Sequence, residues 1–238
     1  RILDTSTAHR TAPGWVYGLP ELHGTREALK TATRVAVPGC HATGFLSTAA
    51  PLAQLGVLPR DYPVTCFSLT GYSGGGKKMI AEYEAPDRSP LLDAPSLYSI
   101  GLAHKHLPEM MRYARLAHAP VFLRVVAPYY KGLAVSVPLD LARIRAAGKM
   151  DVNRAAIHAA LAARYAGERF VQVAPLDAAP EGGFFDVQGS NDTNRADLFV
   201  FGNDDQCMLV ARIDNLGKGA SGAAVQAMNI HLGLDETT

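Results

Sequence analysis

Cys40 lies in the stretch Pro38–Gly44, at a turn from an expected strand into an expected helix. The free peptide N–H groups and the positive dipole end at a helix start lower the pKa of a thiol from about 8.5 toward neutral. The same N–H groups can stabilise an oxyanion on an attacked carbonyl, and Gly39 lets a substrate approach the backbone closely. The pattern favours a cysteine nucleophile, with a buried structural cysteine as the alternative. Cys66 and Cys207 lie in apolar stretches and are expected in the core.

Two histidines, His104 and His106, precede an expected helix start at Pro108. Residues two apart in an extended segment point to the same side, so both imidazoles can serve one site. Glu109, in the first helical turn, can accept a proton from one imidazole and fix its tautomer. A Cys–His pair with an orienting carboxylate is typical of nucleophilic catalysis, and a solvated surface loop is the alternative. No metal site is expected, because Cys-x-x-Cys and His-x-x-x-His spacings are absent from the sequence.

The glycine-rich stretch Ser73–Lys78 can hold an anion through backbone N–H groups, with lysine charges beside it. A flexible hairpin or surface loop is the alternative. The order of a Walker A loop is absent, and no Gly-x-Gly-x-x-Gly follows a strand, so the sequence shows no dinucleotide fingerprint. Lys131 places a further cation at a turn between two expected strands, where an ordinary solvated lysine is the simplest interpretation.

The elements that must position these residues alternate between strands and helices. Strands are expected at about 34–37, 64–70, 121–128, 132–139, 169–173, 184–189, 197–202 and 206–213. Helices are expected at about 40–56, 77–84, 108–117, 151–165 (capped by Asp151) and 219–232. Many strands, several of them expected to be antiparallel, with helices between them, indicate an α/β (α+β) fold with a mixed sheet.

The composition excludes several classes of protein. Of 238 residues, 48% are hydrophobic and 19% charged, which is too apolar for a disordered chain. No apolar run reaches about 18 residues, so no membrane span is expected. Lys and Arg number 23 against 22 Asp and Glu, which leaves no basic field for nucleic acid. Three cysteines cannot form a disulfide framework in a chain of this length, so a reducing, cytoplasmic location is expected.

Several motifs in a fixed order resemble N-acetyl-γ-glutamyl-phosphate reductase, an enzyme family of arginine biosynthesis, in its shorter type 2 form. The matching stretches are Asp4–Arg10, Trp15–Leu22, Pro38–Cys40, Gly71–Tyr83, His104–Glu109, Asn191–Asn194 and Asp214–Gly222. They run almost from end to end, and together they are far more specific than any single motif.

The resemblance implies that a small acyl phosphate is reduced with NADPH to N-acetylglutamate 5-semialdehyde, with release of phosphate. The Cys40 thiolate would attack the acyl carbonyl, phosphate would leave, and the resulting thioester would be reduced to a thiohemiacetal that releases the aldehyde. His104, held by Glu109, is the expected acid–base residue, and His106 is the alternative or a substrate contact.

The resemblance also assigns the binding residues. Groups for the phosphate and carboxylate of the substrate are expected from Arg10, Ser73, Lys77 and Lys131. Gly39 and Asn215 are the expected contacts of NADP(H), Asn215 through the nicotinamide carboxamide. Members of the family assemble as homodimers or homotetramers through the large mixed sheet.

The implied fold is a glyceraldehyde-3-phosphate-dehydrogenase-like C-terminal catalytic domain, with a mixed, largely antiparallel sheet and helices on one face. The expected division is a remnant and leading loop of the cofactor half at 1–36, a catalytic and dimerisation domain at 37–213, and a C-terminal helix at 214–238 that packs on the Rossmann half. Because the family's Gly-rich loop has no counterpart, most of the Rossmann half is expected to be missing and this chain alone to be inactive. A related acyl-phosphate reductase, such as aspartate-semialdehyde dehydrogenase, and a catalytically incomplete dimerising fragment are the alternatives.

Overall fold

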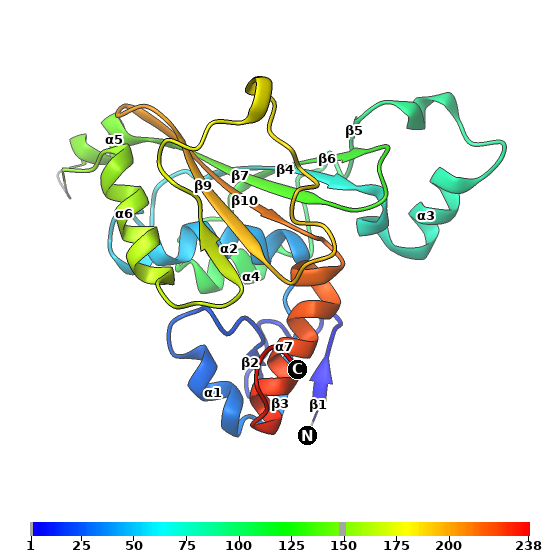
Figure 1. The fold of residues 1–238 in the computed structure, drawn as a ribbon, viewed down its shortest axis with the longest axis horizontal. Helices are drawn as coiled ribbons and strands as arrows, with labels where there is room; N and C mark the ends of the chain where they lie inside the picture. Colours follow the sequence, from blue (N-terminus) through cyan, green and yellow to red (C-terminus); the bar gives the residue numbers. More distant parts are fainter. Residues whose placement is uncertain (1, 148–150) are drawn as a thin grey trace.

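A mixed sheet forms the larger part of the molecule (Figure 1), in a computed structural model that describes residues 2–147 and 151–238. Its strand order is β5-β6-β4-β7-β10-β9-β8. The bounds are β4 Thr65–Gly71, β5 Ser96–Leu97, β6 Val121–Ala127, β7 Leu133–Asp140, β8 Val171–Val173, β9 Ala196–Gly202 and β10 Gln206–Ile213. Within the described ranges only the β4/β6 and β8/β9 pairs are parallel, and the other neighbours are antiparallel. The expectation of a mixed, largely antiparallel sheet is therefore confirmed.

Helices cover one face of this sheet (Figure 1). The central one is α2 (Cys40–Gln54), which is buried continuously from His41 to Leu52. A helix that is apolar or small-sided all round belongs in a core, and α2 packs on β7, β10, α4 (Leu107–Tyr113) and α6 (Arg154–Tyr165). The short helix α5 (Leu141–Ala146) follows β7 at the edge of this layer. Packing on the sheet thus fixes the position of α2, whose first residue is Cys40.

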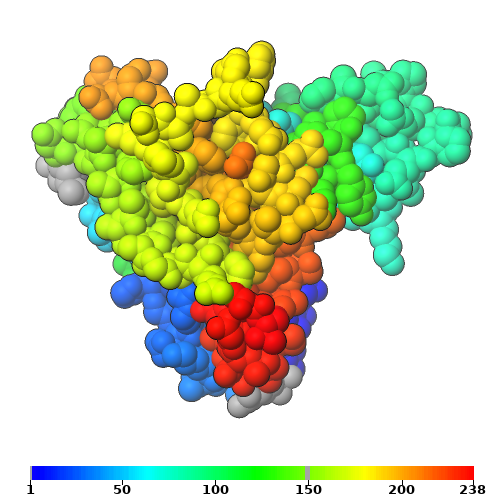
Figure 2. Space-filling view, viewed as in Figure 1, coloured from blue at the N-terminus to red at the C-terminus, as the bar shows by residue number. Residues whose placement is uncertain are grey.

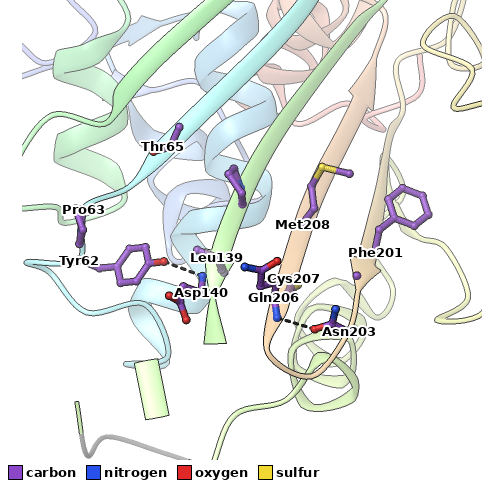
Figure 3. Close-up of a pocket in the computed structure, with 12 residues that line it drawn as sticks. Tyr62, Pro63, Thr65, Leu139, Asp140, Phe201, Asn203, Gln206, Cys207 and Met208 are labelled. Atoms are coloured by element: carbon purple, nitrogen blue, oxygen red, sulfur yellow. Dashed lines mark hydrogen bonds between the residues drawn. The ribbon is translucent and has the colours of Figure 1, made fainter. Parts of the chain in front are cut away.

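The opposite face of the sheet is partly open. Phe67, Leu123 and Met208 are partly exposed there, between buried neighbours on the same strands. Figure 3 shows one end of this face, where a shallow depression of about 490 Å³ is bordered by Tyr62, Phe201 and Met208. The Asp140 N–H donates to the Tyr62 hydroxyl at 2.8 Å at its rim. An apolar sheet face left open in this way is suited to contact with another protein surface.

A smaller layer joins the two ends of the chain (Figure 1). Strands β1 (Ile2–Asp4), β3 (Arg34–Ala36) and β2 (Val16–Tyr17) form a parallel sheet in the order β1-β3-β2. The helices α1 (Thr25–Thr31) and α7 (Gly222–Leu232) pack together there, with α7 preceded by a π-helical turn, η4 (Gly217–Ser221). Their shared apolar core is Leu29, Ala32, Val35, Ala227 and Ile230. The first and last segments therefore form one unit, although they are far apart in sequence.

A projecting arm lies between β4 and β6 (Figure 2). It contains the 3-10 turn η1 (Tyr72–Gly75), the helix α3 (Gly76–Glu84), the 3-10 turn η2 (Pro90–Asp93) and β5. The glycine-rich stretch is thus one ordered turn that runs directly into a helix. Because the helix starts at Gly76, the two lysines that follow it lie on the exposed first turn of α3.

Three expected elements differ from the structure. The helix expected at 108–117 ends at Tyr113, and Arg115 beyond it takes a left-handed φ of 54°. The segment 184–189 forms no strand, because Gly182 and Gly183 take left-handed φ values and Gln188 N–H closes a turn on Asp186. The remaining short helical turn there is η3 (Glu181–Gly183). The helix expected from Asp151 begins at Arg154, because the Asn153 side chain, not Asp151, accepts from a backbone N–H of its first turn. In the part of the chain that the structure describes, no helix is long and apolar enough to span a bilayer.

Candidate active site

The motifs selected from the sequence converge on one pocket of about 660 Å³. It lies among the start of α2, the turn η1, the segment before α4 and the turn η4. Its lining includes Arg10, Gly39, Cys40, His41, Ser73, His104, Lys105, His106, Asn215 and Gly219. Strands β3 and β4 end at this pocket, which follows the general rule that ligands bind beyond the carboxyl ends of strands in α/β sheets. Of the expected site residues, Lys77, Lys131 and Glu109 are not among those that line it.

Two glycines let other groups approach Cys40. A Cβ atom on Gly39 would lie 2.2 Å from Nε2 of His106, and one on Gly219 would lie 2.7 Å from the Cβ of Cys40. Only a residue without a side chain fits at either place. Gly39 thus seats the imidazole beside the first turn of α2, and Gly219 seats the turn η4 against the cysteine. The sequence indicated Gly39 but gave no reason to select Gly219.

The Cys40 thiol differs from the expectation. Burial raises its pKa to about 11, although a backbone N–H hydrogen bond in the first turn of α2 acts in the opposite direction. The expected lowering toward neutral is therefore wrong for this structure, since removal of water from the thiolate outweighs the helix start. The thiol is protonated at neutral pH, so a nearby base has to take its proton as it attacks.

Three imidazoles, those of His41, His104 and His106, line the same pocket as the thiol. The ring centroid of His41 lies 5.6 Å from that of His104 and 5.5 Å from that of His106, and the last two are 4.5 Å apart. Burial lowers the pKa of His104 to about 4 and that of His41 to about 3, and it also lowers the pKa of His106 strongly. All three rings are neutral at pH 7 and can accept a proton.

The three imidazoles are not equivalent. Both ring nitrogens of His41 are occupied, Nδ1 by the Ser68 hydroxyl at 2.7 Å and Nε2 by the Tyr98 hydroxyl at 3.1 Å. Nδ1 of His104 accepts the backbone N–H of His106 at 3.2 Å. Nδ1 of His106 is buried without a partner. His41 was not selected from the sequence, and its place directly after Cys40 was the signal for it.

Glu109 lies behind the pocket, in a different place from the one expected. Its carboxylate accepts from the Arg10 guanidinium at 3.0 Å, the Tyr17 hydroxyl at 2.6 Å and the Gly39 N–H at 3.1 Å. The imidazole near it is that of His106, with 3.9 Å between Nε2 and Oε1, so the expected contact with His104 is not what the structure shows. At 3.9 Å this is an electrostatic contact rather than a hydrogen bond. Burial raises the pKa of Glu109, against the charge of Arg10.

The candidate cations for the substrate divide into two groups. Arg10 lines the pocket while it pairs with Glu109, and Lys105 lines it with an exposed side chain. Lys131 instead pairs with Asp192 and Asp214 outside the lining, and Lys77 is exposed on α3. The sequence placed Lys77 beside the glycine turn correctly but could not show that α3 turns it outward. Lys105, between the two histidines, was missed as a cation.

Asn215 is held firmly at the pocket wall. Its Nδ2 donates to the Ser73 hydroxyl at 2.9 Å, and its Oδ1 accepts the Gly132 N–H at 2.8 Å. This amide therefore ties the turn η1 to the segment that precedes η4. Its orientation is fixed before any ligand arrives, as a recognition group requires.

Comparison with known proteins identifies the family. The chain is 45% identical to N-acetyl-gamma-glutamyl-phosphate reductase 2 of Nostoc sp. over 99% of its length and 75% of that protein. It is 44% identical to N-acetyl-gamma-glutamyl-phosphate reductase of Burkholderia cenocepacia, over 98% of this chain and 74% of that one. The chain belongs to the N-acetyl-γ-glutamyl-phosphate reductase family. The family model for the semialdehyde dehydrogenase dimerisation domain matches residues 40–215.

Solved structures support the fold. Aspartate semialdehyde dehydrogenase II from Vibrio cholerae superposes with a TM-score of 0.71 at 14% identity, over 97% of this chain and 72% of that one. A probable aspartate-semialdehyde dehydrogenase from Pseudomonas aeruginosa gives 0.69 at 16% identity, with the same coverage. At such identities the likeness establishes the semialdehyde dehydrogenase fold, and the chemistry has to be argued from the site.

Proposed function

We propose that this chain carries the catalytic site for NADPH-dependent reduction of N-acetyl-γ-glutamyl phosphate to N-acetylglutamate 5-semialdehyde and phosphate, with Cys40 as nucleophile. The observation that carries the proposal is a thiol on the first residue of a buried helix that lines one pocket with three neutral imidazoles. Relatives that are 45% and 44% identical are named as this reductase. A protonated thiol beside a neutral imidazole is a working nucleophile–base pair.

The first half of the reaction is acyl transfer. Sγ of Cys40 bonds to the acyl carbon while its proton passes to an imidazole, and the oxyanion lies near the free N–H groups at the start of α2. Collapse of the tetrahedral intermediate breaks the bond to the phosphate oxygen, so phosphate leaves and a thioester remains. His106 is the better-placed base because its ring lies against Gly39, and His104, edge-on to it, is the second candidate.

The second half needs a hydride, which NADPH supplies when it is bound. The pocket fits one end of such a cofactor, because the oriented amide of Asn215 lines it together with Cys40. Asn215 would hold the carboxamide. The space beside Gly39 is filled by the His106 ring, so the contact expected between Gly39 and the cofactor has no support from its surroundings. The imidazolium formed in the first half returns its proton to the oxygen of the reduced adduct, and release of the aldehyde regenerates the thiol.

The phosphate group of the substrate is assigned to the open side of the pocket. Lys105 offers an exposed cation there, and Arg10 and the Ser73 hydroxyl lie in the same lining. Such a mixture suits an anion that has to depart at each turnover.

The open face of the large sheet is assigned to a second copy of the chain. Its partly exposed Phe67, Leu123 and Met208 lie within the segment that matches a dimerisation domain. A homodimer through this face would bury them. The free thiols of Cys40, Cys66 and Cys207 agree with a reducing, cytoplasmic compartment.

The test is the reverse reaction of the whole protein: phosphate-dependent reduction of NADP⁺ by N-acetylglutamate 5-semialdehyde, followed by absorbance. We expect turnover with this aldehyde and at least about 100-fold lower kcat/KM with aspartate semialdehyde, which lacks the acetyl group and one methylene. A preference for aspartate semialdehyde would instead support the second candidate, aspartate-semialdehyde dehydrogenase. Absence of turnover with either aldehyde would refute both.

A further inference from the structure

Arg124 is a buried cation without a counter-charge. It lies on β6 with 1% of its surface exposed, and in the described part of the chain it takes part in no ion pair. One guanidinium nitrogen, Nη2, donates to the carbonyl oxygen of Ser99, whereas Nε and Nη1 have no acceptor. A buried charge with unmade hydrogen bonds destabilises a fold. Such an arrangement persists where a ligand supplies the missing partner.

The surroundings place Arg124 directly behind the pocket. Its guanidinium lies 4.8 Å from the ring centroid of Phe122 and 5.8 Å from that of Tyr98, contacts that offset part of the cost. Tyr98 and Ser99 separate it from the pocket, and both of them line that pocket. The charge of Arg124 acts on His41 and His104 as well as on Tyr98, so the guanidinium is electrostatically part of the site.

We propose that Arg124 is the receptor for the carboxylate of the substrate. The inference rests on the proposed function, whose substrate carries a phosphate at one end and a carboxylate at the other. Phosphate has to leave, which suits the open side of the pocket with its exposed Lys105. The carboxylate stays through both half-reactions, which suits a buried guanidinium with free N–H groups. Two charge-assisted hydrogen bonds to Arg124 would fix the substrate relative to Cys40.

The segment over Arg124 is built so that it can give way. Ser99 and Leu102 both take left-handed backbone conformations, with φ values of 50° and 56°. Non-glycine residues in this region of backbone conformation carry strain. The side chains of Leu97, Ile100 and Leu102 are exposed and do not anchor the segment in the core. A carboxylate that replaces the Ser99 carbonyl as the acceptor of Nη2 would let Ser99 leave its strained conformation.

The test compares two aldehydes in the whole protein, with phosphate and NADP⁺. One is N-acetylglutamate 5-semialdehyde, and the other is 4-acetamidobutanal, which has the same chain without the carboxylate. For Arg124→Leu we expect kcat/KM to fall roughly 100-fold for the first and to stay within about threefold for the second. Arg124→Lys, which keeps the charge but loses the planar donors, should lie between. Arg143→Leu removes an exposed arginine on α5 and is the matched control.

A second measurement does not need turnover. N-acetylglutamate should protect Cys40 from iodoacetamide, and Arg124→Leu should raise the half-protecting concentration roughly tenfold or more. Equal losses for the two aldehydes, or a selective rise in the KM for phosphate, would overturn the carboxylate assignment. If no aldehyde is turned over but protection still depends on Arg124, the proposed reaction fails and the anion receptor stands. If turnover is normal and protection is indifferent to Arg124, the inference alone fails.

Discussion

Two clusters of buried polar groups flank Cys40, and they differ in whether their charges are paired. We define the paired cluster as Lys218, Glu21 and Gln226, and the pocket cluster as His41, His104, His106 and Arg124. In the paired cluster, Nζ of Lys218 donates to Glu21 at 2.7 Å and to Gln226 at 2.5 Å, and Gln226 also donates to Glu21 at 2.9 Å. In the pocket cluster, His106 and Arg124 both keep buried nitrogens without a partner.

The paired cluster holds the pocket in shape, whereas the pocket cluster is available to the reaction. Lys218 belongs to the turn η4, whose Gly219 lies against Cys40, and Glu21 belongs to the leading segment of the chain. The ion pair between Lys218 and Glu21, in which the lysine side chain is 0% exposed, therefore holds the η4 wall of the pocket in place. The pocket cluster leaves donors and acceptors free for substrate. A buried network whose charges are paired gives rigidity, even though Oε2 of Glu21 has no hydrogen-bond partner, whereas a buried cation without a counter-charge marks where a ligand belongs.

The largest expected effect comes from the thiol itself. Cys40→Ser should lower kcat by roughly 10⁴-fold or more, because the hydroxyl is a far weaker nucleophile beside a neutral imidazole. The unfolding free energy, from urea titration, should change by less than about 1 kcal/mol. Cys207→Ala, in the core of the sheet, is the control that should keep near-normal turnover. Turnover near the wild-type rate in Cys40→Ser would remove the nucleophile assignment.

The histidines give the next effect. His106→Asn should lower kcat roughly 10³-fold, within the range found for loss of a general base. His104→Asn should cost less, about tenfold, because its ring supports that of His106. Steady-state kinetics of both variants decide the matter. A larger loss in His104→Asn would reverse the two roles and restore the assignment favoured by the sequence.

Substitutions in the paired cluster should change the unfolding free energy of the protein. Lys218→Met leaves the Glu21 carboxylate buried and unpaired, which should lower the unfolding free energy by about 3 kcal/mol or more. The double variant Lys218→Met, Glu21→Leu removes both charges and should recover most of that loss. Urea unfolding of the single and double variants measures the difference. If the double variant is no more stable than the single one, the cluster does not act as a coupled pair.

The buried neutral histidines should make the fold less stable at acid pH. The unfolded chain binds a proton at each histidine near pH 6.5, whereas the pKa of His41 in the fold is about 3. Between these values the unfolded state binds more protons, so stability falls as the pH falls, by about 1 kcal/mol per pH unit for His41. Glu21, whose folded pKa is lowered, adds a loss only below its usual range. His41→Gln should flatten the slope between pH 6.5 and 4.5, and an unchanged slope would contradict burial of a neutral ring.

The sequence was informative where a local pattern decides the structure. Pro38 and Gly39 followed by a run of small and apolar residues predicted the strand-to-helix turn at Cys40, and short apolar stretches predicted the strands of the large sheet. The sequence was uninformative where the environment of a residue depends on a partner far away along the chain. Lys218 is an ordinary helix-start lysine until Glu21, about two hundred residues earlier, lies against it.

The same limit explains the other misses. A charged residue in a strand usually faces solvent, so Arg124 was not selected, although it turned out to be buried behind the pocket. Glu109 was assigned to the wrong imidazole because one helical turn cannot show that Arg10 and Tyr17 draw its carboxylate away. The pKa of Cys40 was expected to fall because a helix start is visible in a sequence and burial is not.

The smallest expected effect is on the pH dependence of the rate at which iodoacetamide labels Cys40. Cys40 is partly accessible, whereas Cys66 and Cys207 are buried, so iodoacetamide should label Cys40 first. Because its pKa is about 11, the labelling rate should rise close to tenfold per pH unit between pH 7 and 9, as the thiolate fraction does. A rate that is flat over this range would mean a thiolate paired with a protonated imidazole. That result would make the pocket cluster a paired one in its resting state, and the distinction between the two clusters would then rest on Arg124 alone.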